Sequence, residues 1–148
     1  SHFGPQQICA AAQRRVRLDA LQLHRVNSQD DLETDMTLIE RVTRDGTTPE
    51  IQRPEAAKVL KGDPVHSTWN LEDRDGLYAG LWQSTPGAWK VSYAEWEYIH
   101  ILSGHSVLTG DDGSVTELRA GDSYLIRPGF SGVWEVVETT LKDYVIRL

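Results

Sequence analysis

The stretch Gly121–Trp134, which reads GDSYLIRPGFSGVW, decides the fold class because it sets a short strand between two turns. Gly121-Asp122 is a turn signal, since glycine supplies the positive φ of a tight turn and aspartate bonds its own backbone. The segment Ser123–Arg127 then reads as a strand. Pro128 ends that strand, because proline lacks the N–H that would continue a ladder of hydrogen bonds.

The same pattern of short segments and turns recurs about every ten residues from position 77 onward. Asp111-Asp112-Gly113, for example, is a hairpin signal between two of these segments. The expected strands are Leu77–Gln83, Trp89–Tyr93, Glu95–Leu102, Ser106–Thr109, Val115–Leu118, Ser123–Arg127, Gly132–Val137 and Thr140–Leu148. Regular short strands without helices between them are typical of an all-β sandwich or barrel.

The N-terminal part of the chain differs in composition from the rest. Residues 1–35 contain no Trp or Tyr, and Ile8–Val26 reads as a helix followed by a polar linker. We interpret 1–35 as an extension and 36–148 as a single domain. One hypothesis makes Met36 the natural start, with an extension that is not native. The alternative is a genuine helix that packs on the barrel or on a partner subunit. Between the linker and position 65, we expect extended chain with one helical turn near Glu55–Leu60.

Composition excludes several classes of protein. The net charge of −7 argues against a nucleic-acid or anionic-membrane surface, both of which need basic patches. No apolar run approaches the roughly 20 residues that cross a bilayer. The single cysteine, Cys9, cannot form an internal disulfide, so the sequence does not require an oxidising compartment. We therefore expect a cytoplasmic protein that binds neither nucleic acid nor membrane.

Two motifs resemble those of the cupin superfamily. Glu97–Gly104, EYIHILSG, resembles the end of the first cupin motif, and Gly121–Trp134 resembles the second. With GLW at 80–82, PGAW at 86–89 and KDY at 142–144, the chain is similar to the cupin-3 type. That type includes ethanolamine-utilisation cupins and ureidoglycine aminohydrolase-like domains. The resemblance implies a jelly-roll (RmlC-like) antiparallel β-barrel over about residues 65–148.

The metal site that this resemblance implies lacks most of its ligands. Metal-binding cupins present two His and a Glu from the first motif and a His from the second. Here Glu97 keeps the carboxylate, Val91–Tyr93 offers no imidazole, and Trp134 occupies the second-motif His position. One ligand of four cannot hold a divalent ion tightly. We expect no metal and no other cofactor, although a weakly bound divalent metal stays an alternative.

Strand parity relates the side chains of the Glu97 strand to one another. If Glu97 points inward, so do Ile99 and Ile101, whereas His100 points outward. His105 follows a turn and His66 precedes the expected strands, so each of these histidines reads as a surface or packing residue.

The resemblance places five residues in the interior as ligand-binding candidates. These are Trp82, Glu97, Trp134, Lys142 and Tyr144. Glu97 and Lys142 are also the catalytic candidates, because a buried Glu–Lys pair can perform acid–base chemistry. The tryptophans have a second interpretation as ordinary core packing, and Lys142 has one as a surface residue.

Three hypotheses for function follow. The first is a module that binds a small polar metabolite in an aromatic-lined pocket. The second is an enzyme, a hydrolase or isomerase of a nitrogen-rich or sugar-like metabolite, that uses Glu97 as acid/base. The third is an assembly role. On the outer face of the Glu97 strand, Trp96, Tyr98 and His100 form a row that favours contact with another subunit, so we expect a homodimer.

Overall fold

The computed structural model describes residues 37–148. The predicted helix, Cys9 and the proposed boundary at Met36 lie outside this range. No helix among the described residues is long and apolar enough to cross a membrane.

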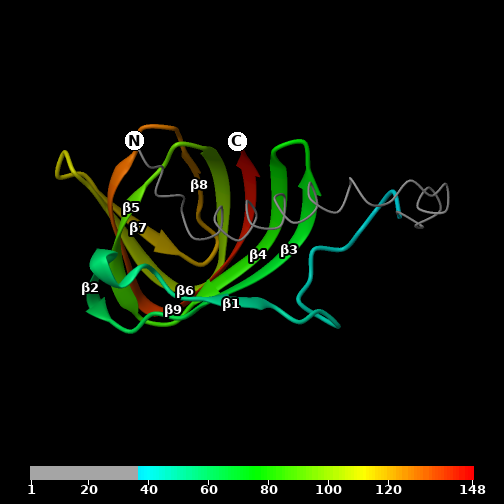
Figure 1. Ribbon diagram of the computed structural model, residues 1–148, viewed down its shortest axis with the longest axis horizontal. Coiled ribbons are helices and arrows are strands. Elements are labelled where there is room, and N and C mark those ends of the chain that lie inside the picture. The colour runs from blue at the N-terminus through cyan, green and yellow to red at the C-terminus, as the bar shows by residue number, and fades with distance from the viewer. Residues whose placement is uncertain (1–36) are drawn as a thin grey trace.

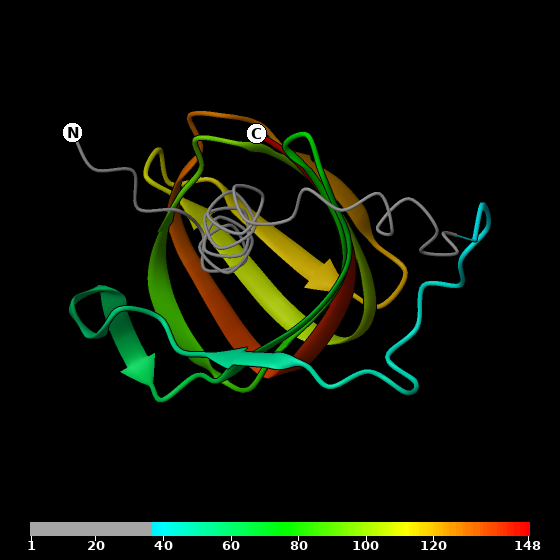
Figure 2. The ribbon, with the colours of Figure 1, turned by 45° about the vertical axis from the view of Figure 1, so that its right-hand side comes forward.

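The described chain is built from antiparallel strands and one 3-10 turn. The elements are β1 (Glu50–Gln52), η2 (Ala56–Lys58), β2 (Val59–Gly62), β3 (His66–Arg74), β4 (Leu77–Ser84), β5 (Gly87–Ser92), β6 (Trp96–Gly110), β7 (Val115–Arg119), β8 (Ser123–Ile126) and β9 (Ser131–Arg147). One path of neighbouring strands runs β1-β3-β4-β9-β5-β2, and β6 joins it through β9 while also pairing with β7 and β8. The sheet curls into the predicted barrel, which encloses the core (Figures 1 and 2).

Two long strands, β6 and β9, run through the centre of the pairing pattern: β9 pairs with β4, β5 and β6, and β6 pairs with β7, β8 and β9. We predicted a break near Gly104 and another near position 138, but both strands continue through these points. The two strands pair along their lengths, and irregularities in β6 between Ile101 and Ser106 absorb the bend. Gly104 has a φ of 90°, and a Cβ there would lie 2.0 Å from the Thr139 carbonyl oxygen. Glycine therefore allows a close approach that keeps β6 continuous where a turn was predicted.

The strand β3 was missed by the sequence prediction, which started the barrel at Leu77. Residues Asp75 and Gly76 link β3 to β4, and both have positive φ, 51° and 78°. That conformation is typical of a two-residue hairpin turn, and Arg74 pairs with Leu77 across it. The placement of His66 ahead of the barrel strands was consequently wrong, because His66 is the first residue of β3 and is buried.

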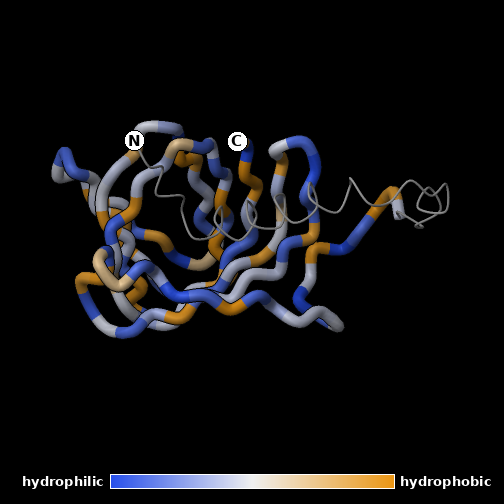
Figure 3. Tube along the Cα trace, viewed as in Figure 1, coloured by the Kyte–Doolittle hydropathy of each residue, from blue (hydrophilic) through white to orange (hydrophobic). Residues whose placement is uncertain are grey.

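The core lies inside the barrel and follows the predicted alternation. On the first part of β6, Glu97, Ile99 and Ile101 are buried, and the residues between them are half-buried. On β9 the even-numbered positions are buried except at Glu138, and Trp134 and Lys142 are among the buried ones. The alternation along the strands is visible as changing hydropathy in Figure 3. Two long strands therefore bring the predicted polar candidates into the interior.

Candidate functional site

The interior holds a charged pair, Glu97 on β6 and Lys142 on β9. Lys142 Nζ donates a hydrogen bond to Glu97 Oε2 over 3.2 Å, and each side chain is 1% exposed. The two residues do not face each other in register, since Lys142 pairs with Ile101 and Glu97 pairs with Ile146. The long lysine side chain therefore runs along the inside of the sheet to reach the carboxylate.

Two tryptophans cover the ammonium group of this lysine. Its Nζ lies 4.7 Å from the ring centroid of Trp82 and 4.5 Å from that of Trp134. Trp82 on β4 is the cross-strand neighbour of Lys142, which explains their contact. The two indoles meet edge to face at 5.5 Å, and Trp134 also stacks on its cross-strand neighbour Trp89.

Lys142 is buried, so water does not stabilise its charge. These contacts stabilise it instead. Removing two ions from water costs several kcal/mol for each ion, and mutual attraction recovers this only with good geometry and further partners. Ring faces attract a cation by about 2 kcal/mol or more once it is desolvated. Lys142 has a carboxylate and two such faces, so its burial as an ammonium is physically reasonable.

Tyr144 lies one inward position beyond Lys142 on β9 but has a different partner. Its hydroxyl donates to Asn70 Oδ1 on β3 over 2.7 Å. The structure thus brings Trp82, Glu97, Trp134 and Lys142 into direct contact and places Tyr144 on the same interior face. The roles assigned to these residues from the sequence stay predictions.

His66 is a further member of this group that the sequence analysis did not select. Its ring lies 5.1 Å from Trp82 and 4.5 Å from Trp89, centroid to centroid. Burial, and then the nearby positive charge of Lys142, lower the pKa of His66 from 6.5 to about 3. The imidazole is therefore neutral near pH 7. The Asp-Gly turn after β3 was the sequence signal that could have placed His66 in the barrel.

We call His66, Trp82, Glu97, Trp134 and Lys142 the interior cluster. Several of its polar atoms have no hydrogen-bond partner within residues 37–148. They are both ring nitrogens of His66, Nε1 of Trp82 and of Trp134, and Oε1 of Glu97. Buried polar groups are hydrogen-bonded in the great majority of cases, so such a concentration calls for an explanation. In contrast, the buried hydroxyls of Ser106 and Thr140 satisfy each other at 2.7 Å.

The residues at the expected metal position do not suit a divalent cation. Glu97 is bound to an ammonium group, which would repel a metal, and an indole stands at the second-motif position. No group of three or more His, Cys, Asp or Glu side chains comes together among the described residues. His100 and His105 are engaged elsewhere, with Asp143 and Glu117 respectively.

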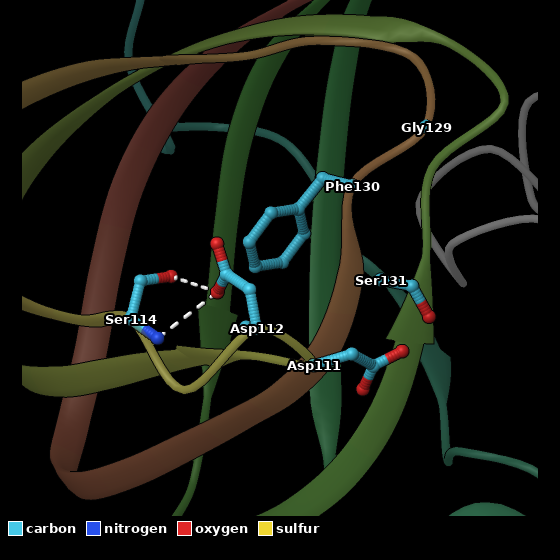
Figure 4. A pocket seen from close by; sticks show the side chains of 7 residues that line it. Asp111, Asp112, Ser114, Gly129, Phe130 and Ser131 are labelled. Carbon is cyan, nitrogen blue, oxygen red and sulfur yellow. Dashed lines mark hydrogen bonds between the residues drawn. The ribbon is translucent and has the colours of Figure 1, made fainter.

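A separate surface cavity of about 320 Å³ lies between the β6–β7 hairpin and the start of β9 (Figure 4). It is lined by Gly110, Asp111, Asp112, Ser114, Gly129, Phe130 and Ser131. Hydrogen bonds from the Ser114 side chain and backbone lower the pKa of Asp112. These bonds stabilise the hairpin turn, as aspartates in turns commonly do. None of the predicted site residues lines this cavity.

Comparison with known proteins agrees with the architecture. A family model described as an EutQ-like cupin domain matches residues 71–144. The chain belongs to this cupin family. No curated protein matches its sequence significantly.

Solved cupin structures resemble the chain in fold. A protein of unknown function from Pseudomonas syringae pv. tomato has a TM-score of 0.61 at 24% identity, covering 67% of this chain and 43% of that one. The Clostridium difficile EutQ protein has a TM-score of 0.52 at 17% identity, covering 57% and 63%. A putative ethanolamine utilisation protein Q from Salmonella typhimurium has a TM-score of 0.51 at 17% identity, covering 69% and 98%. The aligned region thus spans less than two thirds of the first two proteins, and these identities support a common fold only.

Proposed function

We propose that this cupin binds a small polar metabolite inside its barrel, at the interior cluster, without a tightly bound metal. The observation that carries the proposal is the fully buried Glu97–Lys142 pair beneath two indoles. A buried ion pair contributes little net stability, and well-packed apolar residues often replace one without loss. Folding stability therefore does not explain why the pair is present. Ligand binding explains it directly.

The surroundings of the pair fit this role. Aromatic walls with a few well-placed polar groups are the usual composition of a small-molecule site. The unpartnered indole, imidazole and carboxylate atoms supply hydrogen-bonding capacity that the described chain does not use. Each residue of the interior cluster is at most 2% exposed, so a ligand would have to enter through a transient opening. Association slower than for an open cleft is expected on this ground.

A second candidate is catalysis, favoured by the arrangement of the Glu97 carboxylate. One oxygen is bound to Lys142 and the other has no partner in the described chain. A carboxylate held in place through one oxygen can exchange a proton with a bound molecule through the other. The candidate reaction class remains hydrolysis or isomerisation of a nitrogen-rich or sugar-like compound.

Ligand-observed NMR with a library of small polar metabolites tests the proposal. The wild type should bind at least one compound, and Lys142→Met and Trp134→Phe should each weaken that binding at least tenfold. His105→Gln is the matched control, because His105 lies on β6 outside the interior cluster. The proposal fails if no compound binds, or if both interior variants retain binding while folded by circular dichroism. Turnover of a bound compound that Glu97→Gln abolishes would favour the catalytic candidate.

A further inference from the structure

His66 occupies a distinctive position in the interior cluster. It is 1% exposed, its ring packs against Trp82 and Trp89, and neither of its nitrogens has a partner within residues 37–148. A buried imidazole that only fills space would leave two polar atoms unsatisfied at a cost that a phenyl ring would avoid. Its chemistry therefore points to hydrogen bonding with something that enters the barrel.

The charges around His66 are already balanced. Lys142 contributes one positive charge and Glu97 one negative charge, and their ends are in contact. The imidazole is neutral near pH 7, since burial and Lys142 disfavour its protonated form. An added cation would meet the ammonium group, and an added anion would compete with Glu97 for it. Either ion would also leave an uncompensated charge in a low-dielectric interior, which is costly.

The unpartnered polar atoms of the interior cluster include both hydrogen-bond donors and acceptors. A neutral imidazole offers one N–H donor and one acceptor nitrogen, and the two indoles each offer an N–H. Glu97 Oε1 offers a further acceptor. A carboxamide matches this set, because its carbonyl oxygen accepts hydrogen bonds and its NH₂ group donates them.

We propose that His66 is a specificity-determining residue that selects uncharged, carboxamide-bearing molecules over charged ones of the same shape. This inference rests on the proposed function and names its ligand class. Neutral His66 hydrogen-bonds the amide through a ring nitrogen, and the unpartnered indole N–H groups and Glu97 Oε1 are available to the remaining amide atoms. Because Glu97 and Lys142 already neutralise each other, an added ion would find no counter-charge in the cluster.

Acetamide, acetate and acetamidinium test the proposal, since they share one shape and carry charges of 0, −1 and +1 at pH 7. Each is titrated into ¹⁵N-labelled protein while the indole N–H signals of Trp82 and Trp134 are followed. Trp82→Phe and Trp134→Phe assign these signals. Acetamide should shift both signals and bind at least tenfold more tightly than either ion. His66→Phe should weaken acetamide binding at least tenfold. His66→Gln retains a donor and an acceptor and should stay within about threefold of the wild type.

The outcomes separate this inference from the proposed function. If acetate or acetamidinium shifts the indole signals at lower concentration than acetamide, the ligand class is wrong and interior binding stands. The same holds if His66→Phe, folded by its NMR dispersion, binds acetamide like the wild type. If only library compounds other than these three shift the signals, the carboxamide assignment again fails. If no compound shifts them, the proposed function fails as well.

Discussion

Strands β6 and β9 carry two contacts between ionisable side chains that differ mainly in the face on which they lie. Glu97 and Lys142 meet inside the barrel at 3.2 Å, with 1% of each side chain exposed. His100 and Asp143 meet on the outer face at the same distance, with 36% and 31% exposed. The outer pair is directly cross-strand, whereas the inner pair spans several residues along the sheet. The two pairs have the same distance but differ in the free-energy cost of removing one partner, because that cost depends on burial.

The largest expected effect is from breaking the inner pair on one side. Lys142→Met leaves Glu97 buried without its partner, and we expect the free energy of unfolding to fall by about 3–5 kcal/mol in urea denaturation. Replacing both partners, by Glu97→Leu with Lys142→Met, removes the uncompensated charge and should recover most of this loss. A loss below about 1 kcal/mol for Lys142→Met alone would contradict the comparison.

The next effect comes from pH and concerns His66. Its pKa is about 3 in the folded protein and 6.5 as the ordinary value. Between these values the unfolded chain binds the extra proton, so stability falls as pH decreases through this window. The loss at pH 5 relative to pH 7 should be about 2 kcal/mol from this residue. Chemical denaturation at several pH values measures it, and His66→Phe should reduce the slope. An unchanged slope in that variant would assign the acid sensitivity to other groups.

A smaller effect is expected from the outer pair. Asp143→Asn removes a half-exposed partner that water can replace, so the change in unfolding free energy should be about 0–1 kcal/mol. Because solvent-exposed charges are screened, the difference should shrink further in 1 M salt. Denaturation at low and high salt tests this, with Lys142→Met as the contrasting variant. A loss comparable to that of the inner pair would show that exposure does not separate the two.

The smallest effect on monomer stability is expected from the outer aromatic row, whose predicted role is assembly. Trp96 and Tyr98 of this row are half-buried. Leu38 and Ile39, on a separate segment that projects from the barrel (Figure 1), are almost fully exposed. We still expect a homodimer, and Trp96→Lys should reduce the molar mass measured by light scattering to that of a monomer. Tyr124→Lys, on the edge strand β8, serves as a control. A monomeric wild type at micromolar concentration would refute the expectation.

Local signals predicted much of the barrel, and their failures have physical causes. Alternation on β6 predicted that Glu97 and His100 point to opposite faces, and the structure confirms this, with Glu97 on the buried face. The turn signal at Gly104 was interpreted as a break because glycine with positive φ usually marks a turn. Here it allows close contact with β9 instead. β3 was missed because its inward positions include polar residues, among them His66 and Asn70, which weakens the apolar alternation.

By itself, the sequence determined the family and the fold. The signals used were turn residues, the strand period and two motifs. Each depends on residues that are close in the sequence, so each can be recognised without the folded structure. The family resemblance implied an interior position for Glu97 and Lys142, with a surface position of Lys142 as the alternative. Only the tertiary structure decided that Lys142 lies between Trp82 and Trp134, and that His66 joins them. Those contacts depend on cross-strand register and on the reach of a lysine side chain, neither of which a strand specifies before it is paired.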